Sequence, residues 1–178
     1  MTRIIAGEWR GQALPKLKTG TVRPTTDRAR TVLFDTLRNV QGYHVLDLYS
    51  GTGALGFEAL SRGAASLVSI DKNSTYIHQQ KDWIKDRGKQ FKAYSGEVGS
   101  VLKRLKQKYD LIFADPPYDD GIAADIFNLI EACIVVDGLF VFEKSKRDDS
   151  VLNSNILVLE KEKVIAETKI QIYKAHGT

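Results

Sequence analysis

Short apolar segments alternate with helical segments from residue 44 to residue 142, and this alternation limits the possible folds more than any other feature. The predicted strands lie at 44–49, 67–71, 91–94, 109–114 and 139–142. Each is followed by a stretch with helical periodicity or turn residues. Strands that are connected through helices form a parallel sheet. Helices cover both faces of such a sheet, so its strands are apolar on both sides. We therefore predict an α/β fold with a mostly parallel, seven-stranded sheet.

The two ends of the chain depart from this alternation. Two late apolar runs, near 156–160 and 164–173, have no helix between them, so we expect them to pair as an antiparallel hairpin. Residues 3–14 indicate two short strands around a polar, glycine-containing reversal. A helix is expected to start at residues 25–27, which offer N-cap side chains, and to end at Gly42.

These boundaries predict a single domain over residues 1–178. It comprises a basic N-terminal hairpin and loop over 1–24 and a Rossmann-like core over 25–178. The one cysteine, Cys133, excludes an internal disulfide, and three scattered histidines offer no metal-ligand spacing. No run approaches the ~20 apolar residues of a membrane span, and the first residues lack the apolar run of a signal peptide. We expect a soluble cytoplasmic protein without a metal.

Positive charge is concentrated at the N-terminus. Residues 1–40 carry eight basic side chains against three acidic ones, whereas the whole chain has a net charge of +4. A basic segment on a nearly neutral body is typical of an edge that binds a polyanion. Charge alone fits an ordinary basic surface equally well.

A glycine-rich segment over residues 47–56, DLYSGTGALG, lies between a predicted strand and a predicted helix. Gly51, Gly53 and Gly56 have the spacing GxGxxG, and Asp71 ends the next strand 20 residues after Gly51. Glycines permit a tight turn and close backbone approach, and an acid at that position accepts from ribose hydroxyls. The spacing predicts an adenosine-containing ligand. Asp47 favours S-adenosylmethionine over a dinucleotide, because a carboxylate repels a pyrophosphate and attracts a sulfonium.

A stiff corner, Asp115-Pro116-Pro117-Tyr118, directly follows the predicted strand 109–114. Two prolines in series fix the backbone at the carboxyl end of that strand, where ligands bind in open parallel sheets. The corner presents the Asp115 carboxylate and the Pro116 carbonyl as acceptors beside an aromatic ring. Two acceptors and a ring face suit the exocyclic amino group of a planar base.

The glycine loop and this corner together resemble the amino-methylating class I methyltransferases that use S-adenosylmethionine. More narrowly, the chain resembles the RsmD family, bacterial guanine-N2 methyltransferases of small-subunit (16S) ribosomal RNA. The resemblance covers most of residues 1–143. It rests on the segments RIIAGxWRG from Arg3, RPTTDRxR from Arg23, and the run from Asp47 through EALSRGA at 58–64. The C-terminus departs from the family, since KVIA at 163–166 lacks the usual Tyr-Gly turn.

The resemblance implies a role for each matching residue. The cofactor S-adenosylmethionine, whose product is S-adenosylhomocysteine, is expected to contact Asp47, Tyr49, Gly51, Gly53, Asp71 and Glu97. Glu97 stands where the family usually has aspartate. The catalytic corner comprises Asp115, Pro116, Pro117 and Tyr118, with the tyrosine ring stacking on a splayed-out base. RNA contacts are expected at Trp9, Arg10, Arg23, Arg28 and Arg30, each of which also fits a role in packing or on the surface.

The expected partner is 16S ribosomal RNA, within the small subunit or an assembly intermediate, bound by a monomer. Three other amino-directed or non-catalytic functions remain as alternatives. DNA adenine-N6 or cytosine-N4 methyltransferases usually need an additional recognition domain, and protein glutamine methyltransferases usually begin the corner with asparagine. A non-catalytic RNA-binding assembly module on the same scaffold would not need an intact cofactor loop and corner.

Overall fold

The computed structural model describes residues 2–15, 26–117, 124–149 and 152–177. Among these, no helix has the length and apolar character needed to cross a bilayer. The helices are α1 (Asp27–Leu37), α2 (Ala54–Ser61), α3 (Ser74–Ile84), α4 (Val98–Leu102) and α5 (Ala124–Cys133). The strands are β1 (His44–Leu48), β2 (Ser66–Asp71), β3 (Gln90–Ser95), β4 (Tyr109–Ala114), β5 (Ile134–Ser145), β6 (Leu157–Ile165) and β7 (Thr168–Ala175).

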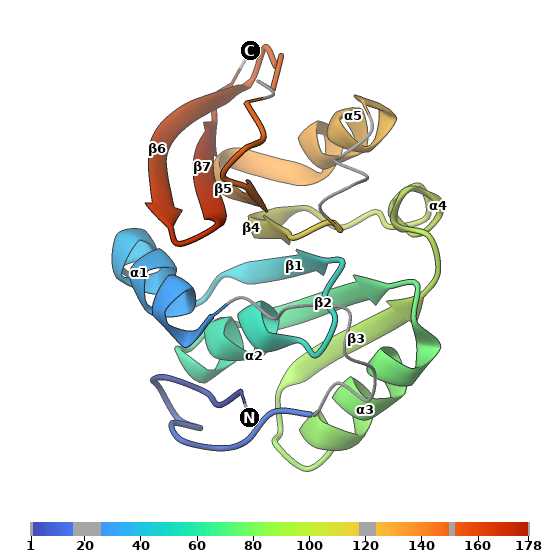
Figure 1. The fold of residues 1–178 in the computed structure, drawn as a ribbon. Coiled ribbons are helices and arrows are strands. Elements are labelled where there is room, and N and C mark those ends of the chain that lie inside the picture. The colour runs from blue at the N-terminus through green and yellow to red at the C-terminus, as the bar shows by residue number, and fades with distance from the viewer. Residues whose placement is uncertain (1, 16–25, 118–123, 150–151, 178) are drawn as a thin grey trace.

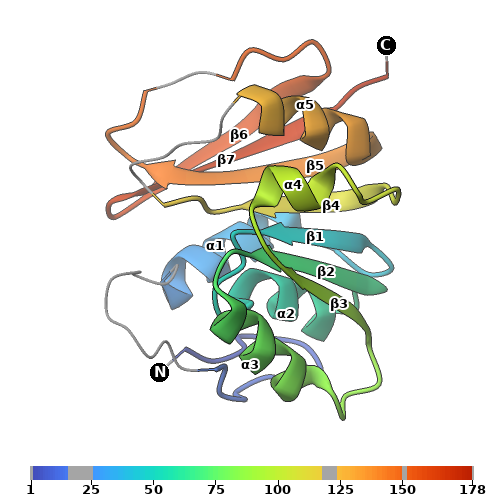
Figure 2. The ribbon, with the colours of Figure 1, turned by 90° about the vertical axis from the view of Figure 1, so that its right-hand side faces the viewer.

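The strands form one seven-stranded sheet in the order β3-β2-β1-β4-β5-β7-β6, which Figure 2 shows along its vertical direction. β1 to β5 pair in parallel, and β7 pairs antiparallel with both β5 and β6. The mostly parallel sheet and its antiparallel C-terminal hairpin confirm the predicted fold class. β1 lies in the middle of the parallel part, so the loop that leaves its carboxyl end has neighbouring strands on both sides.

Helices cover both faces of the sheet, as expected for strands that are apolar throughout (Figure 1). One hydrophobic core joins α1, α2 and the end of α3 to alternate residues of the strands, such as Val45, Leu111 and Val141. The other core joins α4 and α5 to the intervening residues, such as Leu46 and Ile112. Successive side chains of a strand point to opposite faces, so each central strand contributes to both cores.

The start of α1 matches its sequence signal, but the end does not. Thr26 is the N-cap, and its Oγ1 accepts a hydrogen bond from the Ala29 amide at 3.2 Å. The helix ends at Leu37, five residues before Gly42, because Arg38 adopts a φ of 64°. Gly42 instead belongs to the turn that leads into β1.

The C-terminal hairpin pairs as predicted, with its turn later in the chain than the apolar runs indicate. β6 continues through the charged residues 160–163, and Ala166, with a φ of 54°, lies in the turn before β7. β6 is an edge strand and most of its side chains are exposed. Charged side chains suit such an edge, so polarity does not end the strand there.

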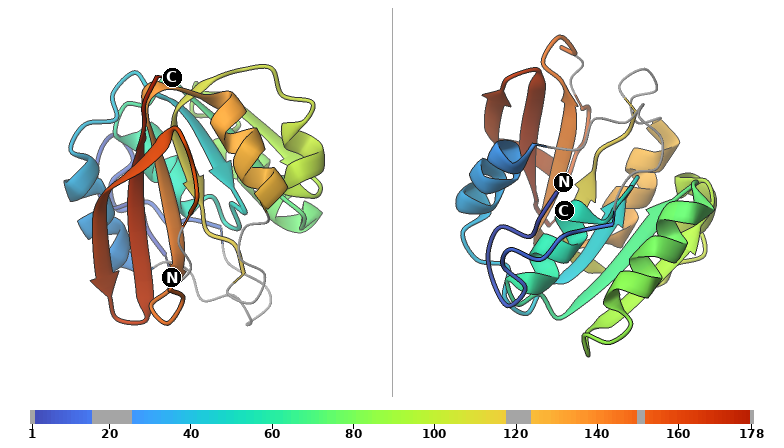
Figure 3. Two further views of the ribbon diagram at one scale, coloured as in Figure 1. Left: turned by 90° about the horizontal axis from the view of Figure 1, so that it is seen from above. Right: turned by 60° about the horizontal axis from the view of Figure 1, so that its bottom comes forward.

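The N-terminal segment, residues 2–15, does not form the two predicted strands. It folds back on itself with a single antiparallel bridge between Arg3 and Ala13. Four of its amides, those of residues 5, 6, 8 and 9, instead donate to α2, beside which the segment lies in the right-hand view of Figure 3. Glu58 is fully buried and accepts from the amides of Ile5 at 2.7 Å and Ala6 at 3.0 Å. Arg62, one turn further along α2, donates to the same carboxylate at 2.8 Å.

Ser61 holds the next part of this segment. Its hydroxyl donates to the Ala6 carbonyl at 2.6 Å and accepts from the Trp9 amide at 3.0 Å, while its carbonyl accepts from the Glu8 amide. Gly7 passes so close that a Cβ there would lie 1.9 Å from the Ser61 carbonyl oxygen. The segment is therefore attached to α2 through its backbone.

Replacing Glu58 should detach this segment. Glu58→Gln keeps the size of the side chain but replaces one acceptor oxygen with an NH₂ group that faces a donor, and it removes the negative charge that pairs with Arg62. We expect a loss of about 3 kcal/mol in the free energy of unfolding, typical of a broken buried pair. Urea denaturation measures it. The matched control is Glu8→Gln, which removes an exposed ion pair with Lys89 and should cost less than about 1 kcal/mol. Equal losses in both variants would contradict this role.

Candidate functional site

Three loops meet at the carboxyl edge of the parallel strands. In the register of the sheet, Leu48 at the end of β1 lies opposite Ile70 of β2 and Ala114 of β4. The glycine loop that follows β1, Asp71 at the end of β2 and Asp115 after β4 therefore lie along one edge. The sheet brings together the glycine loop and the corner, which are more than 60 residues apart in the sequence.

The glycine loop has an unusual backbone. Three of its residues have positive φ angles: Tyr49 at 58°, Gly51 at 52° and Gly53 at 78°. Glycine adopts such angles without penalty, whereas a tyrosine does so at a cost in free energy that the surrounding structure must offset. Strained backbone of this kind clusters at functional sites. Tyr49 thus marks this turn as a candidate ligand site.

Asp47 supplies the cap that the start of α2 lacks. The N-cap residue is Gly53, which has no side chain to accept from the first helical amides. Asp47 reaches from β1 beneath the loop, and its Oδ2 accepts from the Gly56 amide at 3.0 Å. A Cβ on Gly56 would lie 3.0 Å from this oxygen and 2.7 Å from the Leu67 side chain. The third glycine of the motif therefore permits the close approach of helix, carboxylate and sheet.

Burial changes the acidity of Asp47. Only 2% of the residue is exposed. Desolvation raises the pKa of its carboxyl from 3.8 to about 7; the Gly56 amide opposes this rise and the nearby Asp71 charge adds to it. A cation bound above the loop would favour the ionised form. The position suits a positively charged ligand group, as the sequence predicts.

Asp71 and Gln80 hold the peptide groups of Gly51 from two sides. The Gly51 amide donates to Asp71 Oδ2 at 2.8 Å, and the Gly51 carbonyl accepts from Gln80 Nε2 at 2.8 Å. Asp71 Oδ1 accepts from the Asn73 amide at 2.7 Å. Each carboxylate oxygen can accept a second hydrogen bond, so Asp71 can hold the loop and still accept from ribose hydroxyls.

Glu97 lies one strand further along the same edge. It is the N-cap residue of α4, and its exposed side chain makes no capping hydrogen bond. The preceding Gly96 donates its amide to the Asp71 carbonyl at 3.0 Å, which places Glu97 close to the end of β2. The side chain is thus accessible beside the end of β2, where Asp71 lies.

The first three residues of the corner after β4 differ in exposure. Asp115 is half-buried, Pro116 is buried and Pro117 is exposed. Tyr118 lies outside the described residues. Asp115 follows Phe113 and Ala114, which are buried in the two opposite cores and fix the end of the strand. Its carboxylate therefore stands at the rim of the sheet, beside the glycine loop.

The structure separates the predicted RNA contacts into two groups. Arg10 and Arg28 are exposed, whereas Trp9 is 4% exposed and Arg30 is fully buried. Arg23 lies outside the described residues. The predicted phosphate contact by Arg30 does not fit its position, because it falls on the inward face of α1 with Leu33, Phe34 and Leu37. Its Nη2 donates to the Arg3 carbonyl and to Asp27, both at 2.7 Å.

Trp9 likewise does not fit the predicted stacking on a base. Its ring meets the edge of Trp83 at a centroid distance of 5.3 Å. The Arg87 guanidinium lies 3.9 Å from the Trp83 ring centroid and 5.5 Å from that of Trp9. The indole thus packs the N-terminal segment against α3, as the packing alternative predicts.

Two buried polar residues of the site carry no motif and are missed by sequence reasoning. Gln80 belongs to a helix that the sequence marks only as polar. Glu143 is 3% exposed and follows Phe142, which lies opposite Ala114, so it lies next to Asp115. A charged residue directly after an apolar run, as in LFVFE at 139–143, is the one signal that marks it.

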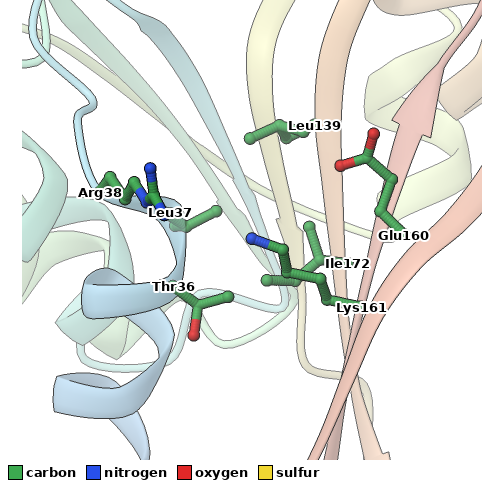
Figure 4. Close-up of a pocket in the computed structure, with 7 residues that line it drawn as sticks. All are labelled: Thr36, Leu37, Arg38, Leu139, Glu160, Lys161 and Ile172. Atoms are coloured by element: carbon green, nitrogen blue, oxygen red, sulfur yellow. The ribbon is translucent and has the colours of Figure 1, made fainter.

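A surface groove lies away from this edge of the sheet. A groove of about 340 Å³ runs between the end of α1 and the strands β5 to β7, and Figure 4 shows Arg38, Glu160 and Lys161 around it. Leu139 in its wall lies opposite Leu111, near the beginning of β4. The groove therefore faces the amino ends of the parallel strands, away from the glycine loop. In the described part of the chain, no three His, Cys, Asp or Glu residues are grouped to hold a metal.

The chain matches known proteins over nearly its whole length. A family model described as conserved hypothetical protein 95 matches residues 2–174. Ribosomal RNA small subunit methyltransferase D of Haemophilus influenzae is 30% identical over 97% of this chain and 93% of its own length. The protein of the same name from Escherichia coli is 36% identical over 72% of this chain and 66% of its own length.

A solved structure shares the whole fold. The Escherichia coli protein yhhF superimposes with a TM-score of 0.89 at 29% identity, over 99% of both chains. The family match covers nearly the full length, including the N-terminal segment and the C-terminal hairpin. The chain therefore belongs to the RsmD family, whose members include the ribosomal RNA small subunit methyltransferases D.

Proposed function

We propose that this protein transfers a methyl group from S-adenosylmethionine to the exocyclic N2 of a guanine in small-subunit (16S) ribosomal RNA. One observation carries the proposal: the sheet gathers the strained glycine loop, the acids Asp47 and Asp71 and the Asp115 corner along one edge. The names of the relatives support ribosomal RNA of the small subunit as the substrate.

The cofactor residues divide between its two ends. Asp71 and Glu97 would hold the ribose and the adenine, while the glycine loop and Asp47 would hold the methionine end. The bound cofactor supplies an activated methyl group on a cationic sulfur. Asp47 lies beneath this end, where its ionised carboxylate favours a positive charge. The loop contributes backbone amides and carbonyls that are already held in place by Asp71 and Gln80.

Asp115 and the Pro116 carbonyl would orient the guanine amino group. The lone pair of N2 is delocalised into the ring, so the amino group is a weak nucleophile until acceptors hold its hydrogens. A carboxylate and a carbonyl on a rigid corner can hold both hydrogens and direct the lone pair toward the methyl group. The main contribution of these residues is orientation, because the methyl donor is already reactive.

The RNA would reach this corner as a splayed-out base. Tyr118 is proposed to stack on the guanine, a contact worth ~1–3 kcal/mol. Arg10 and Arg28, which are exposed, and Arg23 remain the proposed phosphate contacts. We propose 16S ribosomal RNA, in the small subunit or an assembly intermediate, as the partner of a monomeric enzyme.

Asp71→Ala should weaken the binding of S-adenosylhomocysteine. The substitution removes the acceptor for the ribose hydroxyls and releases the Gly51 amide. Losing charge-assisted hydrogen bonds of ~1.5–3 kcal/mol each should raise the dissociation constant at least about tenfold in isothermal titration calorimetry. Asp82→Ala, an exposed acid on α3, is the control and should bind normally. Normal binding by Asp71→Ala would remove this residue from the site.

The raised pKa of Asp47 predicts two opposite pH dependences. Between pH 3.8 and about 7 the folded protein holds a proton that the unfolded chain releases. The stability of the ligand-free protein should therefore fall as pH rises through this window and level off above it. Binding of cationic S-adenosylmethionine should strengthen as pH rises from about 6 to about 8, because Asp47 ionises there.

Asp47→Asn tests both dependences, since its amide oxygen can still accept from Gly56. Chemical denaturation and calorimetry at several pH values should show a flatter profile for stability and for S-adenosylmethionine binding than in the wild type. Asp82→Asn serves as the control, with wild-type slopes. Identical slopes in wild type and Asp47→Asn would show that Asp47 does not titrate in this range.

The corner can be tested without disturbing the cofactor. Asp115→Asn should lower kcat for methyl transfer to ribosomal RNA about 10- to 100-fold, because a neutral acceptor replaces a charged one and a hydrogen bond of ~1.5–3 kcal/mol is weakened. Tyr118→Phe should retain most activity, and Tyr118→Ala should lose about 10- to 100-fold. Mass spectrometry of methylated nucleosides measures transfer and identifies the position on guanine. All three variants should keep wild-type affinity for S-adenosylhomocysteine, and a fully active, folded Asp115→Asn protein would contradict the role of the corner.

A further inference from the structure

We infer that Gln80 is a positioning residue that holds the glycine loop in its cofactor-binding conformation. This inference rests on the proposed function, because it assigns a role within the same site. Gln80 lies on α3, outside the glycine loop and outside the corner, and no motif of the sequence marks it.

The contacts of Gln80 are directed at the loop. The side chain is fully buried, and its Nε2 donates to Ser50 Oγ at 2.9 Å and to the Gly51 carbonyl at 2.8 Å. A carboxamide has two N–H donors, so both are used on the same turn. With the Gly51 amide held by Asp71 Oδ2 at 2.8 Å, both peptide groups of Gly51 are fixed.

The shape of the loop depends on support from below. Gly51 and Gly53 have positive φ angles. Glycine can adopt many other backbone conformations as well, so these two residues do not by themselves fix the shape of the turn. A Cβ on Gly53 would lie 3.1 Å from Gln80 Cδ and 2.8 Å from the Phe57 ring. The loop therefore rests directly on the Gln80 carboxamide and the Phe57 ring.

The other end of the carboxamide is unusual. Gln80 Oε1 is buried and has no hydrogen-bond partner within the described ranges of the chain. An unpaired buried acceptor costs free energy, so a purely apolar residue would suit the packing of α3 better. A glutamine at this position is explained by its two donors. They orient the Gly51 carbonyl beneath the loop, so that the loop is already organised before the cofactor binds.

The test is Gln80→Leu, which keeps a similar volume and removes both donors. We expect the S-adenosylhomocysteine dissociation constant and the KM for S-adenosylmethionine to rise about tenfold, the effect of losing two ordinary hydrogen bonds. The kcat at saturating cofactor should stay near the wild-type value, since the corner is untouched. The melting temperature of the ligand-free protein should fall little, because an unpaired buried acceptor is removed as well.

Gln79→Leu is the matched control, with the same change one residue earlier on α3. Gln79 also has a buried Oε1 without a partner, but no hydrogen bond joins it to the loop among the described residues. The Gln79→Leu protein should bind S-adenosylhomocysteine like the wild type. Ser50→Ala removes only one of the two acceptors of Gln80, so it should raise the S-adenosylhomocysteine dissociation constant by a smaller factor. If Gln80→Leu does not fold, Ser50→Ala takes its place in the test.

The outcomes separate this inference from the proposed function. A wild-type protein that does not bind S-adenosylhomocysteine would overturn the proposed function itself. Normal binding by the wild type and unchanged binding by Gln80→Leu, with or without a lower melting temperature, would overturn only the role of Gln80. A fall in kcat without a rise in KM would also overturn it. Weaker cofactor binding with an intact kcat and an unaffected Gln79→Leu control would support it.

Discussion

The hydrogen bond from the Gly56 amide to the Asp47 carboxylate is the contact on which the rest of the site depends. It joins the central strand β1 to the first turn of α2 and closes the glycine loop between them. Because Gly53 offers no cap, an acceptor oxygen buried in the strand satisfies an amide at the start of the helix. α2 in turn carries Glu58 and Ser61, which hold the N-terminal segment. One buried carboxylate thus links the sheet, the loop and the N-terminal segment.

The parallel part of the fold could be predicted from the sequence because its strands are buried on both faces. Runs such as VLDL at 45–48 and LIFA at 111–114 have no competing helical pattern. The structure of the N-terminal segment could not be predicted, since three of its amides donate to side chains of α2 more than 50 residues away. The turn at Ala166 was hidden for a different reason: an exposed edge strand tolerates the charges that elsewhere mark a loop.

For the candidate site, too, some residues could be predicted from the sequence and others could not. Glycine spacing and the acids at strand ends could be read directly, because the backbone geometry demands those residue types. Burial of charged or polar side chains could not be read. Arg30 and Arg28 are two residues apart and equally basic, yet the first is fully buried and the second exposed. Gln80 is a polar residue in a polar segment of the sequence, and its complete burial and its hydrogen bond to Gly51 are visible only in the structure.

The attachment of the N-terminal segment has a consequence for how this protein tolerates sequence change. The segment is held by its own amides and carbonyls, which every residue other than proline provides. Positions such as Ile5, Ala6 and Glu8 are therefore open to many side chains. Gly7 is not, because a Cβ would meet Ser61. The specificity of this contact resides in α2, so Glu58 and Ser61 should resist substitution while much of the segment they hold can diverge.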